Sequence, residues 1–254
     1  MMNKKVLLAI LFAGSIAFSC SKDEEAPAPV AETPTPTPTP TPTGNTTGST
    51  TPNFNGADAS LWAVKSLSVT TIPGLPPVTT TIGLGVAAFN DGSSNLVSAG
   101  TVMLNSTTLT LNSNNSYTNT IGTTNPTGID FTSGVSWDVS GANGFNAFTK
   151  NVTLPFPTVS EVTSSATITK SSGYTLTVNT VTGADSVMFL IGGVSKTLAG
   201  NATSCTFSSS DLSSLNNGTT VVQVAAYTYN SETIGTKTIY FGNETVQSKT
   251  ATVE

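Results

Sequence analysis

The chain has 254 residues, a formal net charge of -5 and no histidine, and all 9 of its basic residues are lysines. The lack of histidine excludes Ser-His-Asp and Cys-His nucleophiles and His-ligated metals, and the lack of arginine excludes a bidentate phosphate clamp. An acidic chain is a poor ligand for polyanions, so we expect no nucleic-acid partner. Because the catalytic and ligand-binding groups named above are missing, we also expect no cofactor and no enzymatic activity.

The first twenty residues have the pattern of a secretory signal. Two lysines precede an apolar run from Val6 to Phe18, which is too short to span a bilayer. The run ends in Ser19-Cys20, a small residue before a cysteine. This segment resembles a bacterial lipoprotein signal peptide of the Bacteroidota type, although Ala17 stands where that family usually has leucine. An ordinary signal peptide with a coincidental cysteine is the alternative.

The resemblance implies that residues 1–19 are removed and that Cys20 becomes the acylated first residue of the mature chain. Several acyl chains anchor more firmly than one, because each buried CH₂ contributes about 0.8 kcal/mol. The next residues, Ser21-Lys22-Asp23-Glu24-Glu25, resemble the export tag of such lipoproteins, and a plain acidic spacer is the alternative. We therefore expect a protein held in the outer membrane by its lipid and facing the cell exterior.

Residues 20–52 join this anchor to the rest of the chain. A Thr-Pro repeat from Thr33 to Thr43 favours extended polyproline II, which rises roughly 3.1 Å per residue. The Gly, Asn, Ser and Thr residues after it favour a flexible chain. We expect a disordered stalk that carries folded modules away from the lipid surface, with the first module beginning near Asn53.

Residues 53–157 are predicted to form a first β-sandwich module. Ile82, Leu84, Val86 and Ala88 alternate with smaller residues before the turn Asn90-Asp91-Gly92. The segment Pro155-Phe156-Pro157 ends this half of the chain. Further short strands are expected at 102–104, 109–111, 135–139 and 152–156.

Residues 158–254 are predicted to form a second module of short, closely spaced strands. Within it, the segment from Leu215 to Tyr227 resembles the E–F corner and F strand of immunoglobulin-like and fibronectin type III modules. It has Thr220-Val221 where that family often has a tyrosine. The resemblance implies an all-β chain of two tandem sandwiches, and a single large jelly roll is the alternative. The strands are expected at 166–170, 174–178, 186–191, 194–198, 204–208, 220–229, 236–241 and 247–253.

Few side chains suggest a binding or catalytic site. Exposed aromatic rings can stack on sugars, and the candidates for that role are Trp62, Trp137, Tyr227 and Tyr229, with core packing as the alternative. Asp130 and Asp138 are the carboxylates that a hairpin could bring together for glycoside hydrolysis, although turn and cap roles account for most carboxylates here. We predict no metal site within a single loop. Cys205 is the only cysteine left after lipidation, and we expect it to be a buried, inert thiol.

These features favour a non-enzymatic, lipid-anchored protein of the cell surface that serves in adhesion, matrix contact or partner-protein contact. Strand edges and end loops are the expected contact surface. A glycan-binding lipoprotein of a polysaccharide uptake system is the alternative, and a carboxylate-dependent glycoside hydrolase is the third reading. The sequence names neither the surface protein nor the glycan.

Overall fold

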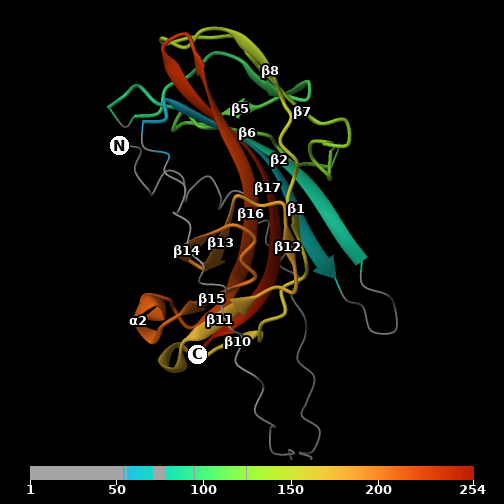
Figure 1. Cartoon of the computed structure of the whole chain (residues 1–254), viewed down its shortest axis with the longest axis vertical. Coiled ribbons are helices and arrows are strands. Elements are labelled where there is room, and N and C mark those ends of the chain that lie inside the picture. Colours follow the sequence, from blue (N-terminus) through green and yellow to red (C-terminus); the bar gives the residue numbers. More distant parts are fainter. Residues whose placement is uncertain (1–53, 55, 71–77, 94, 124) are drawn as a thin grey trace, which may run out of the picture.

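The computed structural model describes residue 54 and the ranges 56–70, 78–93, 95–123 and 125–254 (Figure 1). The predicted signal peptide, Cys20, the export tag and the Pro/Thr stalk lie outside these residues. Nearly all regular structure in the described part is β-strand, apart from one α-helical turn and one 3-10 turn. The predicted all-β fold is confirmed.

The largest sheet, called the main sheet below, has the order β14-β13-β16-β17-β1-β2-β6-β5, and β10 pairs separately with β17. Its central strand β17 is antiparallel to β16 over 17 residue pairs, and β1 lies parallel to β17 on the other side. The strands are β1 (Ala59–Thr70), β2 (Val78–Phe89), β5 (Thr110–Leu111), β6 (Tyr117–Thr118), β10 (Thr167–Ile168), β13 (Ser186–Ile191), β14 (Val194–Ala199), β16 (Gly218–Ile234) and β17 (Lys237–Val253).

Smaller sheets cover one face of the main sheet. One has the order β4-β3-β7-β8, and the other two are the pairs β11-β15 and β12-β9. Their strands are β3 (Val102–Leu104), β4 (Thr107–Thr108), β7 (Val135–Val139), β8 (Phe148–Val152), β9 (Thr158–Val159), β11 (Tyr174–Thr177), β12 (Val181–Thr182) and β15 (Ser204–Phe207). Each is packed against the main sheet through apolar side chains, which is the layer arrangement of a β-sandwich.

Two hydrophobic cores lie between these layers. The first core gathers side chains such as Phe89 and Trp137 from the first half of the chain, and the second gathers side chains such as Phe189 and Phe207 from the second half. Each core draws most of its side chains from one half of the chain, but the main sheet takes strands from both halves. Strand β17 serves both cores, with Ile239 and Phe241 in the first core and Ala251 and Val253 in the second.

A row of polar side chains on β17 lies between the two cores. Asn243, Thr245, Gln247 and Lys249 occupy alternate positions, so they share the face that also carries the core residues of this strand. They donate hydrogen bonds to backbone carbonyls of residues 154–164, the segment that connects the two halves, at distances of 2.7 to 3.5 Å. These bonds satisfy buried carbonyls and hold the connecting segment, called the strap below, against the sheet.

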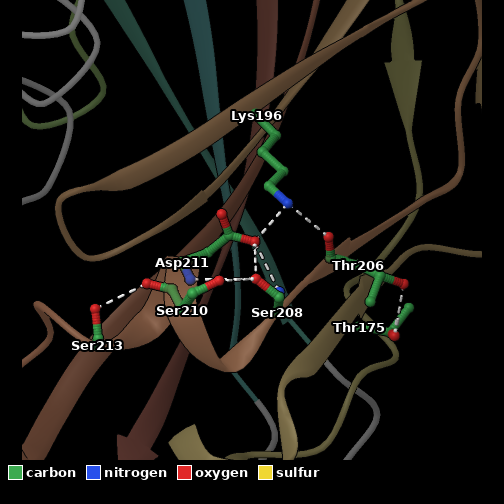
Figure 2. A network of polar contacts seen from close by, with 7 residues as sticks. All are labelled: Thr175, Lys196, Thr206, Ser208, Ser210, Asp211 and Ser213. Carbon is green, nitrogen blue, oxygen red and sulfur yellow. Dashed lines mark hydrogen bonds and ion pairs between the residues drawn. The ribbon is translucent and has the colours of Figure 1, made fainter.

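A second polar network lies at the far end of the second half (Figure 2). The helical turn α2 (Ser209–Leu212) begins with a capping box, in which the Ser208 side chain and the Asp211 carboxylate each accept a backbone N–H of the other residue. Lys196 on β14 donates to Asp211 Oδ2 at 2.6 Å and to the Thr206 carbonyl at 3.0 Å. The Lys196 ammonium and the Ser208 donors lower the pKa of Asp211 to about 2. Asp211 therefore has a structural role in this turn.

Candidate functional site

A cavity of about 550 Å³ opens where the first core gives way to the second, and we call it the crease pocket. Its volume is in the range of small-molecule sites. Strands β1, β2 and β17 contribute to it, together with the loop before β7 and the strap. The lining residues are Lys65, Leu67, Thr81, Gly83, Thr127, Ile129, Asp130, Phe131, Thr132, Phe156, Pro157, Thr158, Val159 and Thr245.

The crease pocket carries one positive and one negative side chain among apolar groups and threonine hydroxyls. The Lys65 ammonium lies 4.1 Å from the centre of the Phe156 ring, a favourable cation–π contact. None of the ion pairs recorded among the described residues includes Lys65. Asp130 accepts hydrogen bonds from the Thr132 N–H and hydroxyl, and these donors, with a smaller effect of Lys65, lower its pKa. The lowered pKa keeps the Asp130 carboxyl ionised at neutral pH, so it can accept further hydrogen bonds from a polar partner.

The pocket adjoins the exposed end of the hairpin formed by the long strands β1 and β2 (Figure 1). The side chains from Val78 to Thr81 are exposed, and the strand becomes buried only beyond Ile82. Val78 is 54% exposed, more than is usual for a large apolar residue. Leu67 and Thr81, which face each other in this hairpin, also line the crease pocket, so the hairpin end and the pocket share residues.

Three of the four predicted sugar-stacking residues come together on the opposite face of the main sheet. Trp62 and Tyr227 pack edge-to-face at 5.5 Å, and the rings of Phe54, Tyr229 and Tyr240 surround them. We call these five residues the aromatic face. Trp62 and Tyr227 are buried, whereas Tyr229 and Tyr240 are partly exposed. Stacking on a sugar requires an open ring face, so only Tyr229 and Tyr240 retain that possibility.

The fourth predicted residue, Trp137, is fully buried in the first core. A sugar cannot reach its ring while the core is closed. Trp137 therefore belongs to the packing of β7 against the main sheet, and it does not contribute to a surface platform.

Glu244 lies in the middle of the main sheet, directly across from Tyr227 on β16 and Val64 on β1. It is 2% exposed, and its Oε1 atom has no hydrogen-bond partner. Burial raises the pKa of Glu244 from an ordinary 4.5 to about 8. Burial, and next the Glu244 charge, also raise the pKa of Tyr227. The burial of Glu244 could have been predicted from the sequence, because period-two spacing places it on the same face of the strand as Tyr240 and Val246.

Other candidate groups have local structural roles. Asp130 bonds within its own loop, and Asp138 on β7 accepts a hydrogen bond from the Thr149 hydroxyl at 3.0 Å. Among the described residues no contact joins the two carboxylates. Cys205 is buried in the second core, and burial raises the pKa of its thiol.

Within the described residues, no cluster of three or more Cys, Asp or Glu side chains could hold a metal ion. The helical turns of this part of the chain are too short to cross a membrane.

Comparisons with known proteins give little guidance. No protein-family model matches the chain, and no curated protein matches it. One solved structure with local likeness is described as "Structural insight into host cell surface retention of a 1.5-MDa bacterial ice-binding adhesin", with 19% sequence identity and a TM-score of 0.25. The match covers 68% of this chain and 57% of that chain, so this chain spans less than two thirds of it.

Proposed function

We propose that this chain is a non-enzymatic, lipid-anchored cell-surface protein whose task is to bind a partner protein or matrix component. The observation that carries the binding role is the crease pocket beside the exposed end of the β1–β2 hairpin. A concave site with a few placed polar groups in an apolar lining is the usual form of a recognition site. The anchoring role rests on the lipoprotein-like sequence that ends at Cys20.

The charges of the crease pocket favour a polypeptide partner. Lys65 and Asp130 offer one charge of each sign, and the threonine hydroxyls around them can donate and accept hydrogen bonds. Phe131 and Phe156 supply apolar surface, with ring centres 5.2 Å apart. A protruding loop that carries both polar and apolar side chains fits this arrangement, because its charged groups can pair with both walls of the pocket.

The anchoring is tested by fractionation. Replacing Cys20 with Ala should release the protein from membranes, and protease added to intact cells should cleave the wild-type protein. If the Cys20→Ala protein stays with the membrane, the anchor has been assigned wrongly.

The contact surface is tested with cells that display the protein on plates coated with purified matrix proteins. Lys65→Ala should reduce attachment several-fold, since it removes the ammonium of the pocket. Lys150→Ala is the matched control, because Lys150 lies on β8 and pairs with Glu232. If both variants attach equally well, the crease pocket is not the contact surface.

Glycan capture is the second candidate, and the partly exposed pair of Tyr229 and Tyr240 favours it. Their ring centres lie 6.3 Å apart with an interplanar angle of 31°. If a glycan array shows binding that Tyr229→Ala abolishes and Lys65→Ala leaves intact, glycan capture replaces protein contact as the function.

A further inference from the structure

One edge of β2 is open over a short stretch. Backbone groups of alternate residues on a strand point to the same side, and the odd-numbered residues of β2 point away from β1. Gly83 bonds with Thr127 and Ile129, Gly85 bonds with Asn119, and the Phe89 carbonyl accepts from Val97 N–H. Ala87 is paired with Tyr117 on β6. The same alternation directs the N–H and C=O groups of Thr79 and Thr81 outward, and no described residue pairs with them.

Between Val78 and Ile82 this open edge has no residue of the kind that usually protects against strand pairing, although Pro76 and Pro77 come directly before it in the sequence. Edge strands are normally protected by charged residues, proline or a bulge. The edge strand β14 carries Lys196 and the edge strand β8 carries Lys150, but the stretch from Val78 to Ile82 contains only valine, threonine and isoleucine. Such residues favour the extended conformation.

The same stretch is self-complementary. Its sequence, Val-Thr-Thr-Thr-Ile, reads almost the same in both directions about Thr80. In an antiparallel pair of two such strands, Thr79 of one copy lies opposite Thr81 of the other, and these are the positions with outward backbone groups. Thr–Thr and β-branched cross-strand pairs are favourable, and no like charges meet.

We propose that β2 is the contact by which two copies of this chain form a two-fold symmetric pair, centred on Thr80. Thr79 of each copy exchanges both backbone hydrogen bonds with Thr81 of the other copy, and the two main sheets join edge to edge. The pairing stops near Ile82, because the segment from Thr127 to Ile129 occupies the next position along the edge. Thr81 also lines the crease pocket, so the two pockets open on the same face of the joined sheet.

The contact is small by the standards of stable interfaces, which bury roughly 1,200 Å² or more. A weak pair is strengthened when both copies are tethered to one surface, because tethering raises their effective concentration. The pairing itself depends on β2 alone and can be measured on the soluble mature chain.

Disulfide trapping tests the register. The protein is residues 20–254 with Cys20→Ser, which leaves the buried Cys205 as its only thiol. Thr80 meets its own counterpart at a non-hydrogen-bonded position, where the two Cα atoms lie about 4.5 Å apart and a disulfide can form. Thr79 and its counterpart are diagonal and more than about 7 Å apart, beyond the reach of a disulfide. Thr80→Cys should therefore cross-link at least about tenfold faster than Thr79→Cys under mild oxidation.

A second substitution tests the backbone bonds. Thr81→Pro removes an outward N–H without disturbing the bonds to β1, so it should lower the cross-linking of Thr80→Cys to the level of the protein that holds only Cys205. Thr81→Val keeps the N–H and is the matched control, which should cross-link normally. The pair is refuted if Thr80→Cys cross-links no faster than Thr79→Cys, or if Thr81→Pro and Thr81→Val behave alike.

Discussion

The buried carboxyl group of Glu244 makes the stability of this protein depend on pH in an unusual direction. The pKa of Glu244 is about 8 in the folded protein and an ordinary 4.5 in the unfolded chain. Between these values the folded state binds more protons than the unfolded state, so the free energy of unfolding decreases as the pH rises. Each pKa unit corresponds to about 1.4 kcal/mol, which gives a total loss on the order of 5 kcal/mol between pH 4.5 and pH 8.

The absence of histidine makes this effect measurable. Histidine is the side chain that ordinarily titrates between pH 5 and pH 8, and the pKa values of Asp58, Asp130 and Asp211 are lowered further below this window. We therefore expect Glu244 to dominate the change in the free energy of unfolding over this range. Urea unfolding of residues 20–254 with Cys20→Ser, without a histidine tag, should show a decrease in the free energy of unfolding that approaches about 1.4 kcal/mol per pH unit near pH 6 to 7.

Replacing Glu244 with Gln should abolish this slope. The variant should also be several kcal/mol more stable than the parent at pH 8, because a neutral amide avoids the desolvation of a buried charge. Glu232→Gln is the matched control, since the side chain of Glu232 is 46% exposed and its removal should leave the slope unchanged. A parent protein whose stability is flat or increases over this pH range would refute the reasoning.

Three further predictions concern packing and folding. Gly242→Ala should destabilise the protein by about 1–3 kcal/mol in urea unfolding, because the added methyl group would meet the Trp62 ring at 2.2 Å. Gly193→Ala is the control and should be tolerated, since open space surrounds Gly193. Cys205 should react with a thiol reagent only when the protein is unfolded in denaturant, and a fast reaction in the native state would contradict its burial. A fragment of residues 53–157 should show no cooperative unfolding by circular dichroism, because β16 and β17 complete its core, and a sigmoidal transition would show that it folds alone.

Much of the strand content could be predicted because short amphipathic strands alternate visibly. Strand β7 buries Val135, Trp137 and Val139 on one side, as the period-two pattern indicated. Strand β13 was predicted with its observed bounds, since its run of β-branched and apolar residues is flanked by turn residues. These elements are defined by nearby residues, so sequence reasoning reaches them.

The central strands were harder to predict because they are buried on both faces. Strand β1 was not predicted at all, since apolar and small residues fill both of its faces near Leu61 and Trp62 and no alternation remains. Strand β17 was predicted as two strands separated at residues 242–246, because Asn243, Glu244 and Thr245 interrupt the apolar pattern. In the fold these polar residues are buried, and two of them bond to the strap.

Only part of the candidate site could be predicted from the sequence. The aromatic residues were selected by type, and Trp137 was included although the fold buries it. The crease pocket could not be predicted, because its walls come from segments as distant as Lys65, Asp130 and Thr245. Only the long-range pairing of β1 with β17 brings these segments together, and no local pattern specifies that pairing.

Because the main sheet runs through both halves of the chain, the crease pocket keeps a fixed shape. A boundary between tandem domains is ordinarily a flexible joint, and a pocket at such a joint changes shape as the domains move. Here the strap residues Phe156 to Val159 form a wall of the pocket, and Thr245 bonds the Pro157 carbonyl to β17 at 2.7 Å. Strand β17 is also packed into both cores, so the wall and the floor of the pocket are fixed to the same strand. The pocket is therefore preorganised, and a partner that fits it loses little affinity to ordering the protein.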